Sequence, residues 1–264
     1  MLTLYHLYVS HFSEKVRWAL DYKGLSYRSR LLVPGAHILT VKRVAGTSTV
    51  PVLVDSETDV VVRDSTDILH YLDRICPDPA LFPYDAEDAA RAAEIESFCD
   101  EHCAPNVARY LYFYVTQYPE LLGQLFQRGL GPGRRLLVRL LLPLVRRGMQ
   151  RRSALTLDNT IRRRAELFAA LDQIELWISA AGGSFLVGDH FGAADLAAAA
   201  VLGPAVRPAG SPWDPERFEN MSIPAGYPPE EVAEFLREVG SRPAAEWVRE
   251  MWARHRRQEG VASE

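Results

Sequence analysis

One stretch decides the fold of this chain: Ser48-Thr49-Val50-Pro51-Val52-Leu53-Val54-Asp55. A short apolar strand opens on Pro51, which has no backbone N–H and therefore suits only the first residue of a strand or an edge. The bond before it is a candidate cis peptide, because proline reduces the preference for the trans form to roughly 0.5–1 kcal/mol. A cis bond would turn the N–H and C=O of Val50 outward at a sheet edge, where an extended peptide could pair with them.

A strand, a helix and a second strand precede this stretch. Residues 2–7 are apolar and rich in β-forming side chains, and residues 25–33 are predicted to form the second strand. The apolar residues between them recur at the spacing of one helical face: Phe12, Val16, Ala19 and Leu20. Two strands this close to one helix imply a right-handed crossover and a parallel pair.

Two strands in hairpin order and a helix follow the proline. The strands are predicted over 52–55 and 60–63. Asp64-Ser65 then caps a helix, in which Ser65 can accept a hydrogen bond from a first-turn N–H. The first half ends near 76–79, a stiff proline-rich linker.

The second half has the pattern of helices throughout. One long helix, or two bent near Pro105, is expected over 85–117, and another carries an apolar stripe over 167–178. Residues 193–206 are nearly all alanine and apolar, which predicts a central helix buried on every side. A last amphipathic helix is expected over 244–255.

In this order and spacing, these pieces resemble the cytosolic-type glutathione S-transferases. The matching motifs are Leu4-Tyr5, Ser10-x-Phe-Ser-Glu-Lys-Val-Arg-Trp-Ala-Leu20, Val50-Pro51, Asp64-Ser65, Ile68-x-x-Tyr-Leu72 and Phe185-Leu-Val-Gly-Asp-His-Phe-Gly-Ala-Ala-Asp195-Leu. The resemblance covers 2–76 and about 165–255. It implies a thioredoxin-like α/β domain over 1–78, an all-α domain over 85–264 and a homodimer.

Composition limits the class of protein. A chain of 264 residues can hold two domains with a core each. The net charge of −4 gives no general reason to expect a nucleic-acid partner. Three cysteines make no disulfide framework, and the N-terminus lacks the pattern of a signal peptide, so a cytoplasmic protein is expected. No apolar run approaches the ~20 residues that span a bilayer.

A glutathione-type enzyme must make a thiolate, and a free thiol with a pKa of about 8.5 is only slightly ionised at neutral pH. Ser10 follows the first strand and precedes the helix that begins near Phe12, where a hydroxyl and a positive helix end can stabilise an anion. The resemblance gives Ser10 the position of the activating residue in the serine- and cysteine-type classes, with Phe12 beside it in the thiol site. Without this resemblance, Ser10 would be interpreted as a loop or cap residue.

Neighbouring side chains are alternatives for this role. Ser13 could be the true N-cap of the helix, with its hydroxyl bound to a backbone N–H. Tyr5 and Tyr8 are further candidates, because some classes of the family use a tyrosine at the end of the first strand. The residue at that tyrosine's usual place is His6. A serine cannot form a mixed disulfide, which argues against thiol-reductase chemistry as the main activity.

The resemblance also assigns the rest of the thiol site. Val50, beside Pro51, would bind the cysteinyl backbone by strand addition. Asp64 would accept from the γ-glutamyl ammonium, and Ser65 with the N–H groups of a helix start would receive the γ-glutamyl carboxylate. His37 would meet the glycyl carboxylate.

Three positions depart from the family's pattern. Asp64 replaces a longer glutamate, Thr49 stands where a basic or glutamine residue often contacts the glycyl end, and Gly192 occupies the N-cap of the core helix. The first two leave open whether glutathione or another small thiol is the ligand. Lys42 is an alternative to His37, and a solvated loop charge is the other interpretation of both.

An arginine-rich segment occupies 118–164 and is interpreted as an insertion, because the family connects its first two long helices more briefly. It contains eleven arginines and no lysine. One interpretation is a basic amphipathic segment lying on an anionic membrane. The favoured one is a lid or extra helices over the second-substrate pocket or the dimer contact, with arginines outward.

The resemblance implies a detoxification-type transferase with glutathione as co-substrate: a thiolate stabilised by Ser10 attacks a small apolar electrophile held between the domains. The electrophile pocket would be lined by the first helix's loop, the 110–114 region and the insertion. Isomerisation or dehalogenation uses the same first step. The alternative is a non-catalytic adaptor or membrane-associated binding protein. No metal site is expected, although two thiols and an imidazole share one helix at Cys99, His102 and Cys103.

Overall fold

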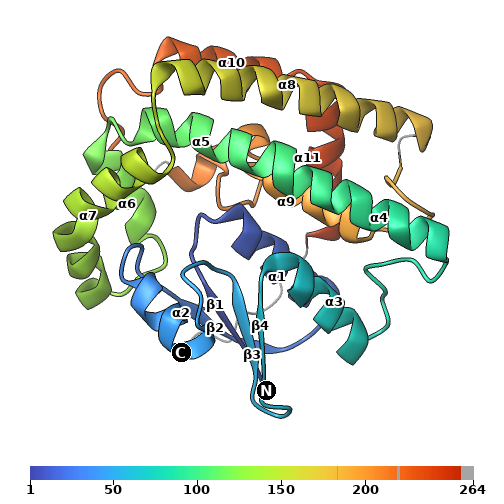
Figure 1. Cartoon of the computed structure of the whole chain (residues 1–264). Helices are drawn as coiled ribbons and strands as arrows, with labels where there is room; N and C mark the ends of the chain where they lie inside the picture. The colour runs from blue at the N-terminus through green and yellow to red at the C-terminus, as the bar shows by residue number, and fades with distance from the viewer. Residues whose placement is uncertain (183, 219–220, 257–264) are drawn as a thin grey trace.

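A four-stranded sheet lies below a layer of helices in the computed structural model, which describes residues 1–182, 184–218 and 221–256 (Figure 1). The N-terminal part alternates strands and helices, and from residue 86 onward the described elements are helices. The predicted fold class, a thioredoxin-like α/β domain followed by an all-α part, is confirmed. Residues 183, 219–220 and 257–264 of the helical domain expected over 85–264 lie outside the described residues.

The sheet has the strand order β2-β1-β3-β4. β1 (Leu2–His6) pairs in parallel with β2 (Tyr27–Leu31), and α1 (His11–Tyr22) makes the predicted crossover between them. β1 also pairs antiparallel with β3 (Val52–Asp55), which pairs antiparallel with β4 (Val60–Arg63). The bounds of β3 and β4 are those predicted, whereas β1 and β2 are shorter than predicted.

The Val50–Pro51 peptide bond is cis, as predicted. Pro51 is buried directly before β3, which is an inner strand between β1 and β4. The expectation that Val50 lies at a lateral sheet edge is therefore wrong. Val50 lies instead beyond the end of β3, where pairing with β1 and β4 has stopped.

The remaining elements of the described chain are helices, including a short 3-10 turn at Pro215–Phe218. Two belong to the sheet domain, α2 (His37–Ala45) and α3 (Ser65–Ile75). The others are α4 (Ala86–Phe98), α5 (Ala104–Val115), α6 (Pro119–Gln127), α7 (Pro132–Arg152), α8 (Leu157–Ala180), α9 (Ala193–Val206), α10 (Glu230–Gly240) and α11 (Pro243–His255). A π-helical turn, Cys99–Cys103, joins α4 to α5 just before Pro105, so the expected bend is a π-bulge.

Every residue of α9 is buried, as its alanine-rich sequence predicted. The Asp195 carboxylate closes the N-terminus of α9 by accepting from the N–H groups of Gly192 at 3.0 Å and Leu186 at 2.7 Å. A Cβ atom at Gly192 would lie 2.8 Å from the carbonyl oxygen of Leu81. This contact explains why glycine stands where the family pattern has serine or threonine.

The 118–164 segment forms α6, α7 and the start of α8. α7 packs on α6, and a small cluster joins this pair to the loop between β2 and α2; its buried members are Val33, Leu130 and Val138. The expectation that the arginines all point outward is wrong. Arg134 and Arg146 donate to the main-chain carbonyls of Leu31 and Thr116. None of the helices, over the described residues, is long and apolar enough to cross a membrane.

Candidate functional site

The strand register brings the predicted site elements to one end of the sheet. At this end Val52 of β3 pairs with Tyr5 of β1 and with Arg63 of β4. The loop before α1, the start of β3 and the start of α3 therefore share this end, and so does the loop after β2. The N-termini of α1 and α3 both begin here, and their free N–H groups favour an anion.

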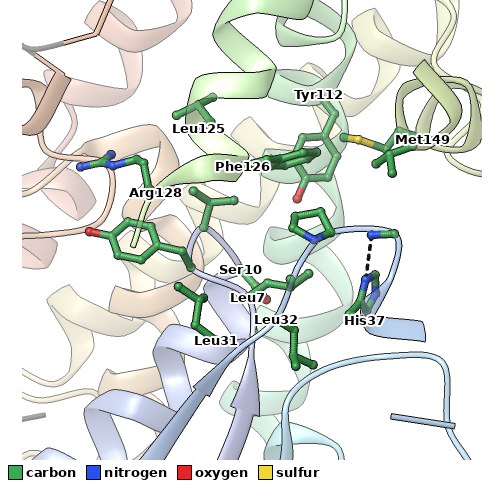
Figure 2. Close-up of a pocket in the computed structure, with 15 residues that line it drawn as sticks. Leu7, Ser10, Leu31, Leu32, His37, Tyr112, Leu125, Phe126, Arg128 and Met149 are labelled. Carbon is green, nitrogen blue, oxygen red and sulfur yellow. Dashed lines mark hydrogen bonds between the residues drawn. The ribbon is translucent and has the colours of Figure 1, made fainter. Parts of the chain in front are cut away.

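A cavity of about 170 Å³ opens at this end of the sheet. Ser10 and His37 line it from the sheet side, while Tyr112 and Phe126 reach it from α5 and α6 and Met149 from α7 (Figure 2). The structure thus brings two of the sequence-predicted residues together. The others do not line this cavity: Phe12, Val50, Pro51, Asp64 and Ser65.

Ser10 is the N-cap of α1, and its Oγ accepts from the N–H of Ser13 at 3.2 Å. Ser13 is therefore not the cap. Its own hydroxyl is fully buried and accepts from the N–H of Leu7 at 3.4 Å. A hydroxyl has one donor and two acceptor positions. Because capping uses only an acceptor position, the Ser10 proton can still be donated to an anion in the cavity.

Asp64 is the N-cap of α3, with Oδ1 accepting from the N–H of Thr66 at 2.9 Å. The expectation that Ser65 is the cap is wrong; Ser65 is the buried first residue of the helix. Asp64 has φ +72° and ψ 143°, a conformation that few non-glycine residues adopt. Such strain is concentrated at ligand sites, and here it fixes where the Asp64 carboxylate stands relative to the helix end.

The remaining predicted residues lie near the same end of the sheet. Phe12 is half-buried in the first turn of α1 and packs against the main core. The Val50 side chain packs on a cluster formed by α2 and β3. Within the described chain, no hydrogen bond uses the main chain of Val50. Thr49 is exposed and bonded to Thr47, and Lys42 is exposed on α2.

His37 is held as a neutral imidazole. Its Nδ1 accepts from the N–H of Gly35 at 3.0 Å, so the ring proton lies on Nε2. Burial lowers the pKa of His37, and the charge of Arg152 lowers it further. The ring therefore offers the cavity a neutral donor rather than a cation.

The tyrosines near the cavity differ in what they can do. The Tyr8 ring lines the cavity below Arg128, and its hydroxyl accepts from Arg217 at 3.3 Å. Tyr5 packs against the cluster on α2 instead. Tyr112 lines the cavity with its hydroxyl directed toward the sheet side (Figure 2). The sequence indicated only the 110–114 region, because three tyrosines alternate there and packing alone decides which of them faces the cavity.

A second cavity of about 280 Å³ adjoins the first. Four residues line both cavities: Val9, Tyr112, Leu125 and Phe126. The walls of the second cavity are mostly aliphatic and aromatic side chains from α5, α6, α10 and the segment after α9. It can therefore hold an apolar molecule next to whatever occupies the Ser10 cavity.

Two basic side chains line this second cavity, His11 and Arg207. Burial lowers the pKa of His11 to about 4, so its ring is neutral at neutral pH. Arg207 is the C-cap of α9 and is partly buried, which lowers its pKa. Its backbone N–H donates to the Gly203 carbonyl at 2.8 Å, whereas its guanidinium forms no hydrogen bond or ion pair with another described side chain and is influenced only by the charges of Asp214 and Tyr227. A desolvated guanidinium gains from an anionic partner, so Arg207 favours a molecule that carries negative charge.

The thiols of the second domain are used for packing. Cys99 and Cys103 are fully buried in the main core, and the His102 ring lies 4.7 Å from that of Phe98. Over the parts of the chain that the structure describes, no cluster of three or more His, Cys, Asp or Glu side chains could hold a metal ion.

Comparisons with known proteins agree with this architecture. Residues 4–80 match the family of glutathione S-transferase N-terminal domains. Over 117 residues the chain is 34% identical to glutathione S-transferase Z2 of Arabidopsis thaliana, a match covering 43% of this chain and 52% of that relative. The chain thus spans about half the length of this relative. These matches support a relationship between this chain and the glutathione S-transferase family.

Solved structures show the same fold over the whole chain. A glutathione S-transferase of Methylobacterium radiotolerans, in complex with glutathione sulfonate, is 21% identical with a TM-score of 0.56, covering 100% of this chain and 98% of the other. The β-etherase LigF of a Sphingobium strain is 20% identical with a TM-score of 0.58, covering 94% and 98%. The class that the fold defines is therefore the glutathione transferase architecture.

Proposed function

We propose that this protein is a glutathione-dependent transferase that joins the thiol of glutathione to an apolar electrophile. The observation that carries this proposal is Ser10: an N-cap hydroxyl lines a cavity at the end of a thioredoxin-like sheet. Support also comes from the relatives, several of which hold glutathione or a derivative of it in their solved structures.

In the proposed reaction, Ser10 donates its hydroxyl proton to the sulfur as a hydrogen bond, and the N-terminus of α1 adds a favourable field. Both stabilise the thiolate against the thiol, which raises the fraction of nucleophile at neutral pH. The sulfur then forms a bond to an electrophilic carbon. In a substitution, the displaced group leaves with the electron pair of its bond to that carbon. In an addition, the electron pair of the broken π bond takes up a proton from solvent. The hydroxyl of Tyr112 faces the same cavity and is a second candidate donor.

The rest of glutathione would extend along the sheet end. We assign the cysteinyl backbone to the main chain of Val50 beside Pro51, and the γ-glutamyl end to Asp64 and Ser65 at the start of α3. The register supports this assignment, because these residues and Ser10 share one end of the sheet. His37 would donate from Nε2 to the glycyl carboxylate. Phe12 would support the thiol site from the first turn of α1.

The electrophile would occupy the second cavity. Its aliphatic and aromatic walls suit an apolar body, and Arg207 adds a preference for an anionic group on that body. An assay with paired electrophiles that differ only by a carboxylate would measure this preference. A homodimer and a cytoplasmic location belong to the same proposal, and an isomerase or dehalogenase uses the same thiolate.

The test is the Ser10→Ala variant, assayed for conjugation of glutathione to a generic electrophile. We expect turnover to fall by about tenfold or more, which is about 1.4 kcal/mol of transition-state stabilisation. Thr156→Ala is a matched control, because Thr156 caps α8 by accepting from the N–H of Asn159 at 3.3 Å and lines neither cavity. Each variant loses one cap, worth roughly 1 kcal/mol of stability, but only Ser10→Ala should lose turnover.

An unchanged rate in Ser10→Ala would remove Ser10 from the mechanism. The alternative function is a non-catalytic adaptor, which the departures at Asp64 and Thr49 favour. Retention of the wild-type protein on immobilised glutathione separates the two functions. A protein that is not retained and shows no rate above background is the adaptor.

A further inference from the structure

The two long faces of α7 have different surroundings. One face packs inward: Val138 is buried, and Val145 and Met149 line the Ser10 cavity. The opposite face carries Leu136, Leu140 and Leu144, which recur every fourth residue and therefore form one stripe along the helix. Figure 1 shows α7 at the outside of the molecule, at the left of the view.

This stripe is unusually exposed for leucine. The exposed fractions are 56% for Leu136 and 70% each for Leu140 and Leu144, and the neighbouring Leu137 is 38% exposed. Isolated exposed leucines are common on protein surfaces, but a row of them along one helix face marks an interaction site. The sequence alone could not separate this row from the inward leucines, because leucine and valine occupy both faces of α7.

Positive charge surrounds the stripe. α7 contains seven arginines and no acidic residue, although the whole chain has a net charge of −4. Arg139, Arg147 and Arg151 are exposed, and across the described chain none of their guanidinium groups forms an ion pair or a hydrogen bond. Exposed leucines with unpaired arginines beside them fit a partner that has an apolar interior covered by a layer of anionic groups.

We propose that the outer face of α7 docks on a membrane surface that contains anionic lipid. The leucine stripe enters the boundary of the acyl chains, and the arginines beside it contact the lipid phosphates. The helix lies in the plane of the surface. At 21 residues it is about 31 Å long, but its arginines and Pro143 exclude a spanning orientation.

Other occupants fit the face less well. In a two-fold dimer through α7, the same arginines would meet across the contact with no acidic residue on the helix to pair with them. A nucleic acid would use the arginines but would leave the leucine stripe exposed. An anionic membrane satisfies both kinds of side chain.

This docking would bring the membrane close to the proposed electrophile site. Val145 and Met149, on the inner face of the same helix, line the Ser10 cavity, which adjoins the larger apolar cavity. An apolar electrophile dissolved in the bilayer would therefore lie close to the helix that lines the Ser10 cavity. The docking itself does not depend on the proposed reaction.

The test is co-sedimentation of the full chain with vesicles of phosphatidylcholine, with and without phosphatidylglycerol. We expect binding only to the anionic vesicles at low salt, and about a tenfold loss of binding when salt is raised, because screening weakens each arginine's contact. The double variant Leu140→Glu, Leu144→Glu should lose about tenfold or more of this binding, since it places acids on the lipid-facing stripe. The matched control is Leu176→Glu, a similarly exposed leucine on α8 at 63%.

A second double variant, Arg139→Gln with Arg147→Gln, should lose binding in the same way without adding acids. All these residues are exposed, so circular dichroism should show an unchanged fold. Conjugation of a water-dissolved electrophile should also be unchanged, which distinguishes failed docking from failed chemistry. The inference is overturned by no sedimentation at low salt, by sedimentation that either α7 pair leaves intact, or by an oligomer in solution that the leucine pair dissociates without vesicle binding.

Discussion

The sheet domain meets the helices through two contacts of opposite character. On one side α1 packs on α3 and α9 within the main core, and buried ion pairs cross the contact. On the other side the loop between β2 and α2 touches α6 and α7 through one small cluster next to the cavities. The first contact is large and contains buried charges, whereas the second is small, uncharged in its buried part and next to the site.

The first contact contains a lysine with no exposed surface. Lys15 of α1 pairs with Glu96 and with Asp100, the latter at 2.7 Å, and Glu96 also accepts from the hydroxyl of Thr66 on α3. Burial raises the pKa of Asp100 to about 6, although the charge of Lys15 acts in the opposite direction. The ion pairs tie α1, α3 and the π-helical turn together directly behind the N-termini that face the site.

The second contact is small and closely fitted. Gly35, with φ +88°, lies so near α7 that a Cβ atom there would be 2.5 Å from the Val145 methyl Cγ2. The buried part of the cluster is only Val33, Leu130 and Val138. Because this cluster buries less apolar area than the main core, weakening it should cost less stability while altering a wall of the Ser10 cavity, which α7 lines.

The largest effect is expected from Lys15→Met. This variant leaves Glu96 and Asp100 buried without a cation, which should lower the free energy of unfolding by about 3–5 kcal/mol. Chemical denaturation of both proteins measures the difference. The matched control is Arg237→Met, because Arg237 and Glu230 form an exposed pair whose side chains are 65% and 79% accessible. That variant should change stability by less than about 1 kcal/mol.

Neutralising Glu96 and Asp100 in addition to Lys15 tests whether unpaired charge causes the loss of stability. If burial of unpaired charge is the cause, adding Glu96→Gln and Asp100→Asn to Lys15→Met should recover part of the lost stability. A triple variant less stable than the single one would mean that the hydrogen bonds, rather than the charges, hold the first contact together.

The first contact shows what the sequence could predict. The spacing of apolar residues, together with the turn residues, was sufficient to predict β3, β4, α9 and α11, because their sequence patterns are regular. Neither the pairing of Lys15 with acids some eighty residues away nor the π-helical turn has a local signature. At the site, the position of Ser10 before a helix was predictable, because cap chemistry is local. The cap at Asp64 was assigned to Ser65 because both residue types cap helices, and only the backbone conformation distinguishes them.

An intermediate effect on the free energy of unfolding is expected when the pH is lowered, through His6. His6 accepts from Arg17 at Nδ1, 2.8 Å away, and donates to the Ser29 hydroxyl 2.7 Å away, so its ring is neutral. Burial lowers the pKa of His6 to about 3 from about 6.5. The folded state therefore binds a proton at His6 more weakly than the unfolded state does. The contribution of neutral His6 to the free energy of unfolding is complete above pH 6.5 and is lost as the pH falls toward 3.

The slope is about 1.4 kcal/mol per pH unit for one proton. Unfolding measured between pH 6.5 and 4 should therefore depend less steeply on pH in His6→Asn than in the wild type. His190→Asn is the control, because it removes a histidine that is 47% exposed and outside this network. Equal slopes for His6→Asn and the wild type would mean that protonation of His6 does not contribute to the pH dependence of unfolding.

The smallest effect on stability is expected at the second contact, from Val138→Ala. Removing two buried methyl groups there should cost about 1–2 kcal/mol. The small cluster positions α7 over the cavities without touching Ser10, so KM for an apolar electrophile should change more than kcat. The control is Val239→Ala on α10, where the side chain is fully buried in the main core and lines neither cavity. Val239→Ala should lose similar stability and keep its KM. If Val138→Ala were as costly as Lys15→Met, or if both valine variants shifted KM equally, α7 would be part of the fixed frame and the two contacts would not differ.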